Sequence, residues 1–188
     1  EGREKLAKKK KRNKIKKQNS NTKNPPDKLL NSLLRHYQNG RLSDAEKLSL
    51  EITQDFPKHQ FAWKVLGAIL GATGRKPEAL DANQMAVELS SQDATAHYNL
   101  GITLKELGRL QEAEVSFRLA IALKSDYAKA HINLGISLKE LGRLDEAEAS
   151  YKQAIALKPD HAKTHYNLGN TLKELGRLDE AEVSYKQT

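Results

Sequence analysis

The sequence of 188 residues contains no cysteine. A disulfide framework, a thiolate nucleophile and a zinc–thiolate site are therefore excluded, and the composition suits a reducing compartment. The chain has no apolar run of the roughly 18 to 20 residues that a membrane-spanning helix needs, and its lysine-rich N-terminus lacks the apolar segment of a secretory signal. We therefore expect a cytoplasmic protein that does not cross a membrane.

Apolar side chains are scarce, since 38% of the residues are hydrophobic and 5% are aromatic. A repeat architecture tolerates this composition because each unit shares its core with its neighbours. A glycine-rich phosphate loop is also missing, because each glycine stands alone in the pattern described below. We expect no cofactor.

Positive charge is concentrated at the N-terminus, in EGREKLAKKKKRNKIKKQNSNTKN. Residues 1–24 carry a net charge of +9 and the whole chain carries +8, so residues 25–188 carry 8 − 9 = −1. Because Leu6 and Ile15 are the only sizeable apolar side chains here, we expect residues 1–25 to form a disordered basic tail. Three interpretations are open: a solubilising leader, weak nonspecific contact with an anionic polymer such as RNA, or contact with an anionic membrane surface.

A 14-residue motif occurs three times, 34 residues apart: HYNLGITLKELGRL from His97, HINLGISLKELGRL from His131 and HYNLGNTLKELGRL from His165. Within a copy, Leu134, Leu138 and Leu141 recur at intervals of four and three, which is typical of an amphipathic helix. A second stripe of this kind begins at Leu144. Each copy therefore predicts two helices.

Turn signals separate the two predicted helices and end the second one. Gly142 follows the first stripe, where a left-handed residue ends a helix, and Pro159 follows the second, where a helix cannot continue. An antiparallel helix pair results. In this frame the chain divides into a tail, an atypical first repeat, three full repeats and a repeat cut short at the C-terminus: residues 1–25, 26–59, 60–93, 94–127, 128–161 and 162–188.

Small residues mark the places where helices approach closely. Gly135, Ala147 and Ala154 carry almost no side chain, and the larger Tyr151 fills the space around them. A bulky residue at Gly135 is expected to overpack this contact. No single pair can bury its apolar stripe alone, so neighbouring pairs are expected to stack.

The repeat resembles the tetratricopeptide repeat (TPR). The resemblance rests on leucine and glycine at positions 7 and 8, alanine at 20, Phe or Tyr at 24, alanine at 27 and proline at 32: Leu134, Gly135, Ala147, Tyr151, Ala154 and Pro159 in one copy. The copies depart from the pattern at Asn83, at Ser125 and Gln92, and at Ser32 and Leu33 in the first copy. The resemblance implies an all-α, right-handed solenoid of antiparallel helix pairs.

The last three copies look most like those of O-linked N-acetylglucosamine transferases and of bacterial TPR fusion proteins. A scaffold that binds a protein or an extended peptide in its concave groove, without catalysis of its own, is the function that the resemblance favours. The alternative is the substrate-recruiting part of a larger enzyme, with a glycosyltransferase, sulfotransferase or oxygenase domain after Thr188.

The resemblance places positions 2, 5, 6, 9, 12 and 13 of each copy on the inner face. Position 6 is Asn99, Asn133 and Asn167. A side-chain amide offers a donor and an acceptor together, so a row of amides can bind the main chain of a peptide with little regard for its sequence. The other interpretation is a row of polar residues on a solvated helix face. Further candidates for this surface are Tyr98, Tyr166 and Asn170.

A second family pattern, the clamp for a C-terminal carboxylate in chaperone partners, is matched in part. Lys64, Asn99 and Lys129 fit it, but Ala68 and Asn133 replace its second Asn and its Arg. Loss of the bidentate Arg removes the strongest charge-assisted contact, which disfavours the clamp. The Lys105–Glu106 doublet and its counterparts in later copies are interpreted either as ligand contacts or as a solvated face.

Periodic histidines and paired carboxylates do not predict chemistry. His97, His131 and His165 recur at a position that the family uses for packing, so we expect no metal site. Glu146 and Glu148 stand at the start of a helix, where negative charge is favourable, and a pair two residues apart does not face one site. We expect no catalytic residue in this chain.

Overall fold

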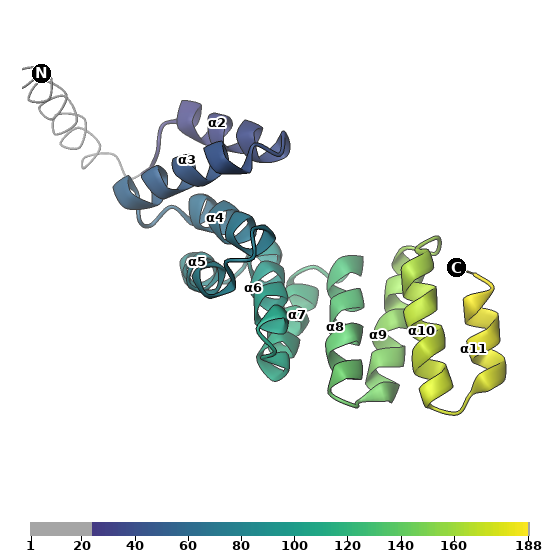
Figure 1. The fold of residues 1–188 in the computed structure, drawn as a ribbon. Helices are drawn as coiled ribbons and strands as arrows, with labels where there is room; N and C mark the ends of the chain where they lie inside the picture. Colours follow the sequence, from purple (N-terminus) through teal and green to yellow (C-terminus); the bar gives the residue numbers. More distant parts are fainter. Residues whose placement is uncertain (1–23, 188) are drawn as a thin grey trace, which may run out of the picture. The chain divides into compact units, whose positions relative to one another are not determined.

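The computed structural model describes residues 24–187, and within them the chain forms ten α-helices and no strand (Figure 1). The expectation of an all-α fold is confirmed. The basic tail that the sequence predicts for residues 1–25 falls almost entirely outside the described residues. The helices belong to two compact units, the first ending at Leu89 and the second beginning at Ser90.

The first unit holds four helices: α2 (Asp27–Gln38), α3 (Leu42–Asp55), α4 (Gln60–Ala72) and α5 (Lys76–Leu89). Each packs against the next. Leu33, Ile52 and Ile69 are fully buried at their centre. Leu33, which replaces the glycine of later repeats, therefore serves as a core residue in this first pair.

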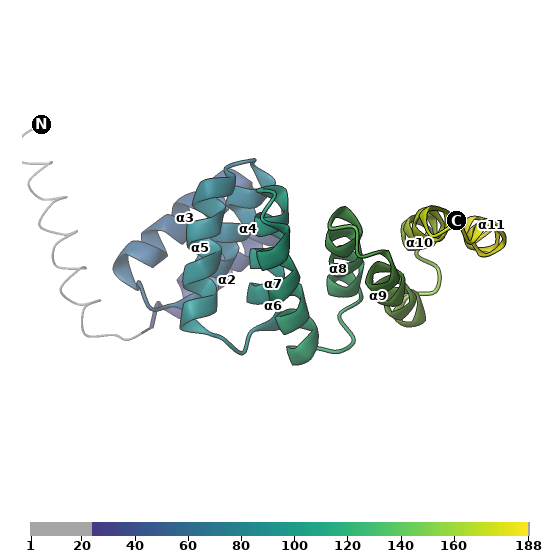
Figure 2. The ribbon, with the colours of Figure 1, turned by 90° about the horizontal axis from the view of Figure 1, so that it is seen from below.

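The second unit holds six helices: α6 (Ala94–Glu106), α7 (Leu110–Leu123), α8 (Ala128–Glu140), α9 (Leu144–Leu157), α10 (Ala162–Glu174) and α11 (Leu178–Tyr185). Consecutive helices lie side by side, as Figures 1 and 2 show for α8 with α9 and for α10 with α11. The first helices of neighbouring pairs also touch, α6 with α8 and α8 with α10. They therefore form one continuous face.

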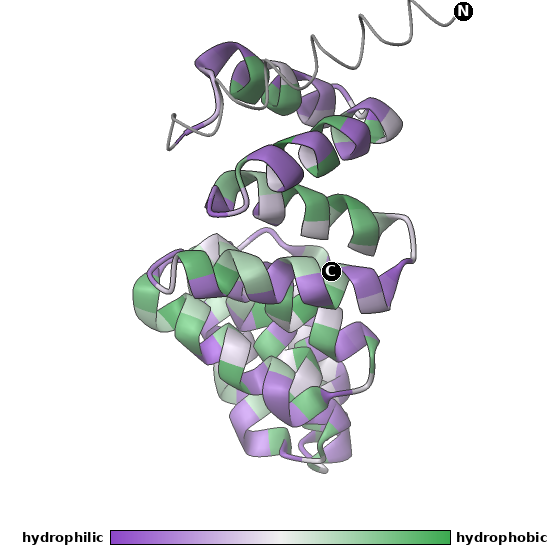
Figure 3. Ribbon diagram, turned by 90° about the vertical axis from the view of Figure 1, so that its left-hand side faces the viewer, coloured by the Kyte–Doolittle hydropathy of each residue, from purple (hydrophilic) through white to green (hydrophobic). Residues whose placement is uncertain are grey.

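Each helix divides between apolar and polar sides, and Figure 3 shows green and purple residues alternating along the ribbons. Leu138 is 1% exposed and Tyr151 is 1% exposed, while charged residues such as Glu140 and Lys152 on the same helices are exposed. The amphipathic stripes predicted from the sequence are the buried stripes. No helix within residues 24–187 combines the length and apolar character needed to cross a membrane.

A glycine lies in the turn between the two helices of each pair, as Gly142 does between α8 and α9. Its φ of 75° lies in the left-handed region that glycine adopts without steric cost. The Gly142 N–H donates to the Lys139 carbonyl and the Arg143 N–H donates to the Leu138 carbonyl, each at 2.9 Å, which is the Schellman ending of a helix. This ending places the arginine that follows the glycine at the N-cap of the next helix.

A second glycine in the pair, Gly135, lets α8 and α9 approach closely. A Cβ atom built at Gly135 would lie 2.7 Å from Cε1 of Tyr151, so the ring occupies the space of the missing side chain. Gly101 meets Phe117 and Gly169 meets Tyr185 in the same way. In the first unit, the polar Asn83 covers Gly67, so Asn83 fills the aromatic position of the repeat.

Replacing Gly135 by alanine is expected to destabilise the fold by about 1–3 kcal/mol, because the new methyl group would displace the Tyr151 ring. Gly71→Ala on α4 is the matched control, since a Cβ there meets nothing within 4 Å. Removing a helical glycine should raise stability by up to about 1 kcal/mol. Urea denaturation followed by circular dichroism measures both, and changes of the same sign would contradict the packing described here.

Ion pairs connect each of the last two pairs of helices to the pair before it. Arg143 contacts Glu146 of its own repeat and Glu114 of the preceding repeat, both at 2.6 Å. Arg177 repeats the arrangement one repeat later, with Glu148 at 2.5 Å. Burial acts to raise the pKa of the Glu148 carboxyl, but hydrogen bonds from Lys152 and Arg177 hold it below its usual range. This contribution to stability is present above the carboxyl's unfolded pKa and is lost as the pH falls through its folded pKa.

Candidate functional site

The three asparagines that we call the asparagine row, Asn99, Asn133 and Asn167, lie at equivalent places on α6, α8 and α10. All three are half-buried. The residues that follow them turn to the other side of the helix, where Leu134 is 5% exposed and Leu168 is 7% exposed. Leu100 is half-buried, less enclosed than its counterparts. One helix thus presents an amide on one side and a core leucine on the other.

Asn133 is held by two groups from the preceding repeat and by one from its own helix. Its Oδ1 atom accepts a hydrogen bond from Lys105 Nζ at 2.8 Å. Its Nδ2 atom donates to the Lys129 carbonyl at 3.0 Å and to the Tyr98 hydroxyl at 3.3 Å. Both ends of the amide are therefore engaged, and its orientation is set before any ligand arrives.

Asn167 has a different environment because its potential partners differ. Lys139, the counterpart of Lys105, forms an ion pair with Glu174 at 2.7 Å. Ile132, the counterpart of Tyr98, has no hydroxyl group. Within the described chain the Asn167 side chain makes no hydrogen bond. The row therefore combines a fixed amide at Asn133 with an open one at Asn167.

The pKa values of the two side chains bonded to Asn133 are also shifted. Burial lowers the pKa of the Lys105 ammonium; Glu140 and Glu106 oppose the shift, and Lys163 adds to it. Burial raises the pKa of the Tyr98 hydroxyl, so this group stays protonated at neutral pH.

Aromatic rings accompany the row. The ring of Tyr98 lies 4.9 Å from that of Tyr127 and 6.0 Å from that of Phe117, measured between centroids. Tyr166 is 54% exposed and lies 5.9 Å from the ring of Tyr185. The Tyr185 hydroxyl donates to Oδ1 of Asn170 at 2.8 Å, so this half-buried amide already supports the last pair of helices.

The lysines predicted for the site lie in different units. Lys129 is exposed on α8 and reaches the row through its carbonyl, which accepts from Asn133. Lys64 lies on α4 in the first unit. The structure thus brings Tyr98, Lys129 and Asn133 together and places Tyr166, Asn167 and Asn170 on one helix.

The periodic histidines serve packing. His97 and His165 are buried, and their Nε2 atoms lie 2.9 Å and 2.7 Å from carbonyl oxygens of the preceding loops. His131 repeats the contact at 3.2 Å. No group of three or more His, Asp or Glu side chains suited to a metal ion occurs between residues 24 and 187.

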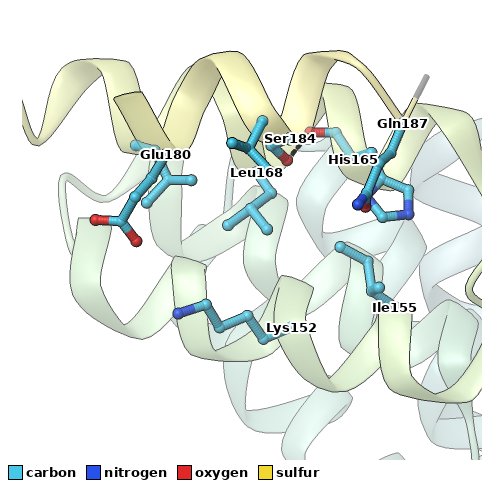
Figure 4. Close-up of a pocket in the computed structure, with 9 residues that line it drawn as sticks. Lys152, Ile155, His165, Leu168, Glu180, Ser184 and Gln187 are labelled. Carbon is cyan, nitrogen blue, oxygen red and sulfur yellow. Dashed lines mark hydrogen bonds between the residues drawn. The ribbon is translucent and has the colours of Figure 1, made fainter. Parts of the chain in front are cut away.

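Two hollows lie beside the second helices, and we call them the crevices. One, of about 300 Å³, is formed by α9, α10 and α11, with Ile155 and Leu168 in its wall. Figure 4 shows Lys152 and Glu180 at one end of it and His165 and Gln187 at the other. The other, of about 370 Å³, repeats this wall one repeat earlier with Ile121 and Leu134.

The charged groups at the end of the first crevice already have partners. Lys152 pairs with Glu148 at 2.7 Å, and Glu180 pairs with Arg177 at 2.6 Å. The crevices therefore offer apolar surface without an uncommitted charge. Sequence reasoning missed the crevices because Leu134 and Leu168 lie in an apolar helical stripe and are therefore expected in the core. The 34-residue repeat alone does not show where two consecutive second helices leave a gap between them.

Sequence reasoning also missed the link from Asn133 to Lys105 and Tyr98. A signal was present, because the repeat beginning at Ala94 has tyrosine at position 5 and the next one has isoleucine. This difference decides which asparagine receives a hydroxyl partner.

Comparison with known proteins identifies the repeat. Residues 31–94 and 94–127 match the tetratricopeptide repeat, and residues 137–176 match a TPR repeat. No curated protein matches the chain.

Solved structures agree with the fold. MamA is 25% identical with a TM-score of 0.76, over 81% of this chain and 90% of that one. MamA from Desulfovibrio magneticus RS-1 is 18% identical with a TM-score of 0.78, over 86% and 91%. YrrB, described as a TPR protein with an unusual peptide-binding site, is 21% identical with a TM-score of 0.74, over 85% and 82%. The repeat matches, spread over both compact units, and the shared fold lead to one conclusion: the chain belongs to the tetratricopeptide repeat family.

Proposed function

We propose that the protein is a binding scaffold whose asparagine row holds an extended segment of a partner protein. The observation that carries the proposal is the pairing of a half-buried polar amide with a buried leucine on each of α8 and α10. Such a helix keeps its core while presenting a polar amide to a ligand, and on α10 this amide offers both a donor and an acceptor. No chemistry is assigned to the chain.

The row suits main-chain binding better than the crevices do. A peptide backbone carries one N–H donor and one carbonyl acceptor per residue, and both must be satisfied when the peptide is buried. The amide of Asn167 supplies both kinds of group, and the Oδ1 atom of Asn133, which accepts one bond from Lys105, keeps a second lone pair for a peptide N–H. The crevice walls, by contrast, are formed by apolar side chains such as Ile155 and Leu168. The asparagine rows of O-linked N-acetylglucosamine transferases are the pattern that this proposal follows.

The aromatic residues add apolar contacts to the same face. Tyr166 is the exposed ring on α10, and a ring of this kind contributes contact area at low cost in side-chain entropy. The peptide-binding site described for YrrB, a protein of the same fold, supports a peptide as the kind of ligand. The proposed partner is therefore an extended peptide with an apolar side chain near Tyr166.

The test is a triple variant, Asn99→Ala with Asn133→Ala and Asn167→Ala, measured against peptides selected from an unbiased library. Each amide should contribute about 0.5–1.5 kcal/mol to binding, so the triple variant should bind at least about tenfold more weakly. Fluorescence anisotropy of a labelled peptide gives the dissociation constants.

A matched control removes exposed amides elsewhere on the unit. Gln111→Ala on α7 and Gln153→Ala on α9 should leave the affinity unchanged, because both side chains lie on second helices. Unchanged affinity in the triple variant would show that the row is not the binding surface. Stronger loss in the Gln variants would assign binding to the second helices and the crevices.

A further inference from the structure

Lys105 is a cation without a carboxylate partner on the face of the first helices. Its ammonium is half-buried, and its one described side-chain contact is the neutral oxygen of Asn133 at 2.8 Å. No ion pair of Lys105 is found among residues 24–187. An ammonium removed from water and bonded to a neutral group lacks the charge compensation that buried charges usually have.

In the next repeat, the lysine at the same position has a carboxylate partner. Lys139 is paired with Glu174 at 2.7 Å, on the following first helix. The counterpart of Glu174 beside Lys105 is Glu140, which is close enough to influence the Lys105 titration but does not form an ion pair with it. The two lysines share a repeat position but differ in their charge partner.

Other charges near Lys105 do not cancel it. Glu106 and Glu140 act in favour of its charged form, whereas Lys163 on α10 acts against it. Lys163 is exposed and has no ion pair within the described part of the chain. The charges around Lys105 thus act in opposite directions, and none of them forms an ion pair with it.

The site also has hydrogen-bond donors to spare. An ammonium group has three N–H donors, and Asn133 takes one from Lys105. The Tyr98 hydroxyl accepts from Asn133 and keeps its own proton for donation. The Asn133 amide, held between these two groups, fixes both donors. This arrangement suits a ligand that brings a negative charge and two acceptor oxygens.

We infer that Lys105, Tyr98 and Asn133 form a subsite for the side-chain carboxylate of a glutamate or aspartate within an extended peptide. The inference rests on the proposed function, because the peptide must lie along the asparagine row to deliver its acidic residue here. It adds a sequence preference to a row that otherwise binds main chain.

The experiment uses a library of ten-residue peptides with acetylated N-termini and amidated C-termini, so that every carboxylate belongs to a side chain. Screening against the whole chain should enrich glutamate or aspartate at one position. An enriched peptide and its Glu→Gln counterpart are then compared by fluorescence anisotropy. The protein should prefer the glutamate form about tenfold, as charge-assisted hydrogen bonds predict.

Substitutions assign the preference to one side chain. Lys105→Met should reduce the tenfold preference to about one. Lys139→Met is the matched control, because the Lys139 ammonium already has Glu174, and it should leave the preference intact. Lys105→Glu should favour a counterpart peptide with lysine in place of glutamate. Circular dichroism verifies that all three variants keep their helices.

The outcomes separate this inference from the proposed function. Peptides that need the asparagine row but show no acidic preference would overturn the subsite and leave the scaffold function standing. A tenfold preference that survives Lys105→Met would assign it to another cation and overturn the subsite. A preference seen with free but not amidated C-termini would identify the terminal carboxylate as the ligand, against the inference. A library without any binder would overturn both.

Discussion

Replacing Tyr151 by alanine is expected to lower the free energy of unfolding by about 3–5 kcal/mol, the range for truncating a large buried ring. Tyr151 is 1% exposed and is among the largest fully buried side chains between residues 24 and 187. The cavity left behind would border Gly135, which has no side chain to fill it. On the Gly135 side, helix α8 can therefore fill the space only by moving its backbone.

Tyr166→Ala is the matched control for this prediction. It removes the same side chain from a position that is 54% exposed, so it should change stability by less than about 1 kcal/mol. Urea denaturation followed by circular dichroism compares the two variants. Equal losses in the free energy of unfolding would show that burial of the Tyr151 ring does not stabilise this pair of helices.

A second test couples Tyr151 to Gly135. Because the ring occupies the space of the missing Cβ, Gly135→Ala should be less damaging in the Tyr151→Ala background than in the original chain. Contacting residues usually show such non-additive effects. Strict additivity would mean that the two residues do not share one space.

Three substitutions on the first helices should lower the free energy of unfolding by different amounts. Leu134→Ala should have the largest effect, about 2–5 kcal/mol, because of the cavity that it leaves. Asn133→Ala removes hydrogen bonds to Lys105 and Tyr98 and should cost about 1 kcal/mol. Asn167→Ala removes no described hydrogen bond and should stay within about 0.5 kcal/mol.

The order of these three effects is the measurement that matters. Thermal or urea unfolding of the three single variants gives it directly. A destabilisation by Asn167→Ala as large as that by Leu134→Ala would place the asparagine row in the core, and the division of the helix into two faces would be wrong.

The sequence predicts the helix pairs well because their causes are local. The spacing of Leu134 and Leu138 places both on one side of α8, and Gly142 supplies the left-handed residue that ends it. Both signals act within a few residues. The close approach at Gly135 is also accessible from sequence, since a glycine inside an apolar stripe indicates that another group occupies its side-chain space.

The contacts of the asparagine row were harder to predict from the sequence. Asn133 is bonded to residues 28 and 35 positions earlier, at repeat positions different from its own. A period of 34 residues aligns equivalent positions, but it does not state which unlike positions meet across two repeats. That depends on how far each helix pair is turned relative to the one before. The sequence therefore identifies the row but not the partners that make its members differ.

The pairing of Arg143 with Glu114, and of Arg177 with Glu148, bears on how such a chain can evolve in length. Each pair joins an arginine of one repeat to a glutamate of the repeat before, so duplicating residues 128–161 would regenerate the pair at the new junction. Within the second unit, gaining a repeat in this way preserves the ion pairs between neighbours. The face of the first helices is not preserved, because the duplicate carries Ile132 where residues 94–127 carry Tyr98. Duplication of this repeat can therefore lengthen the scaffold while leaving the proposed carboxylate subsite in a single copy.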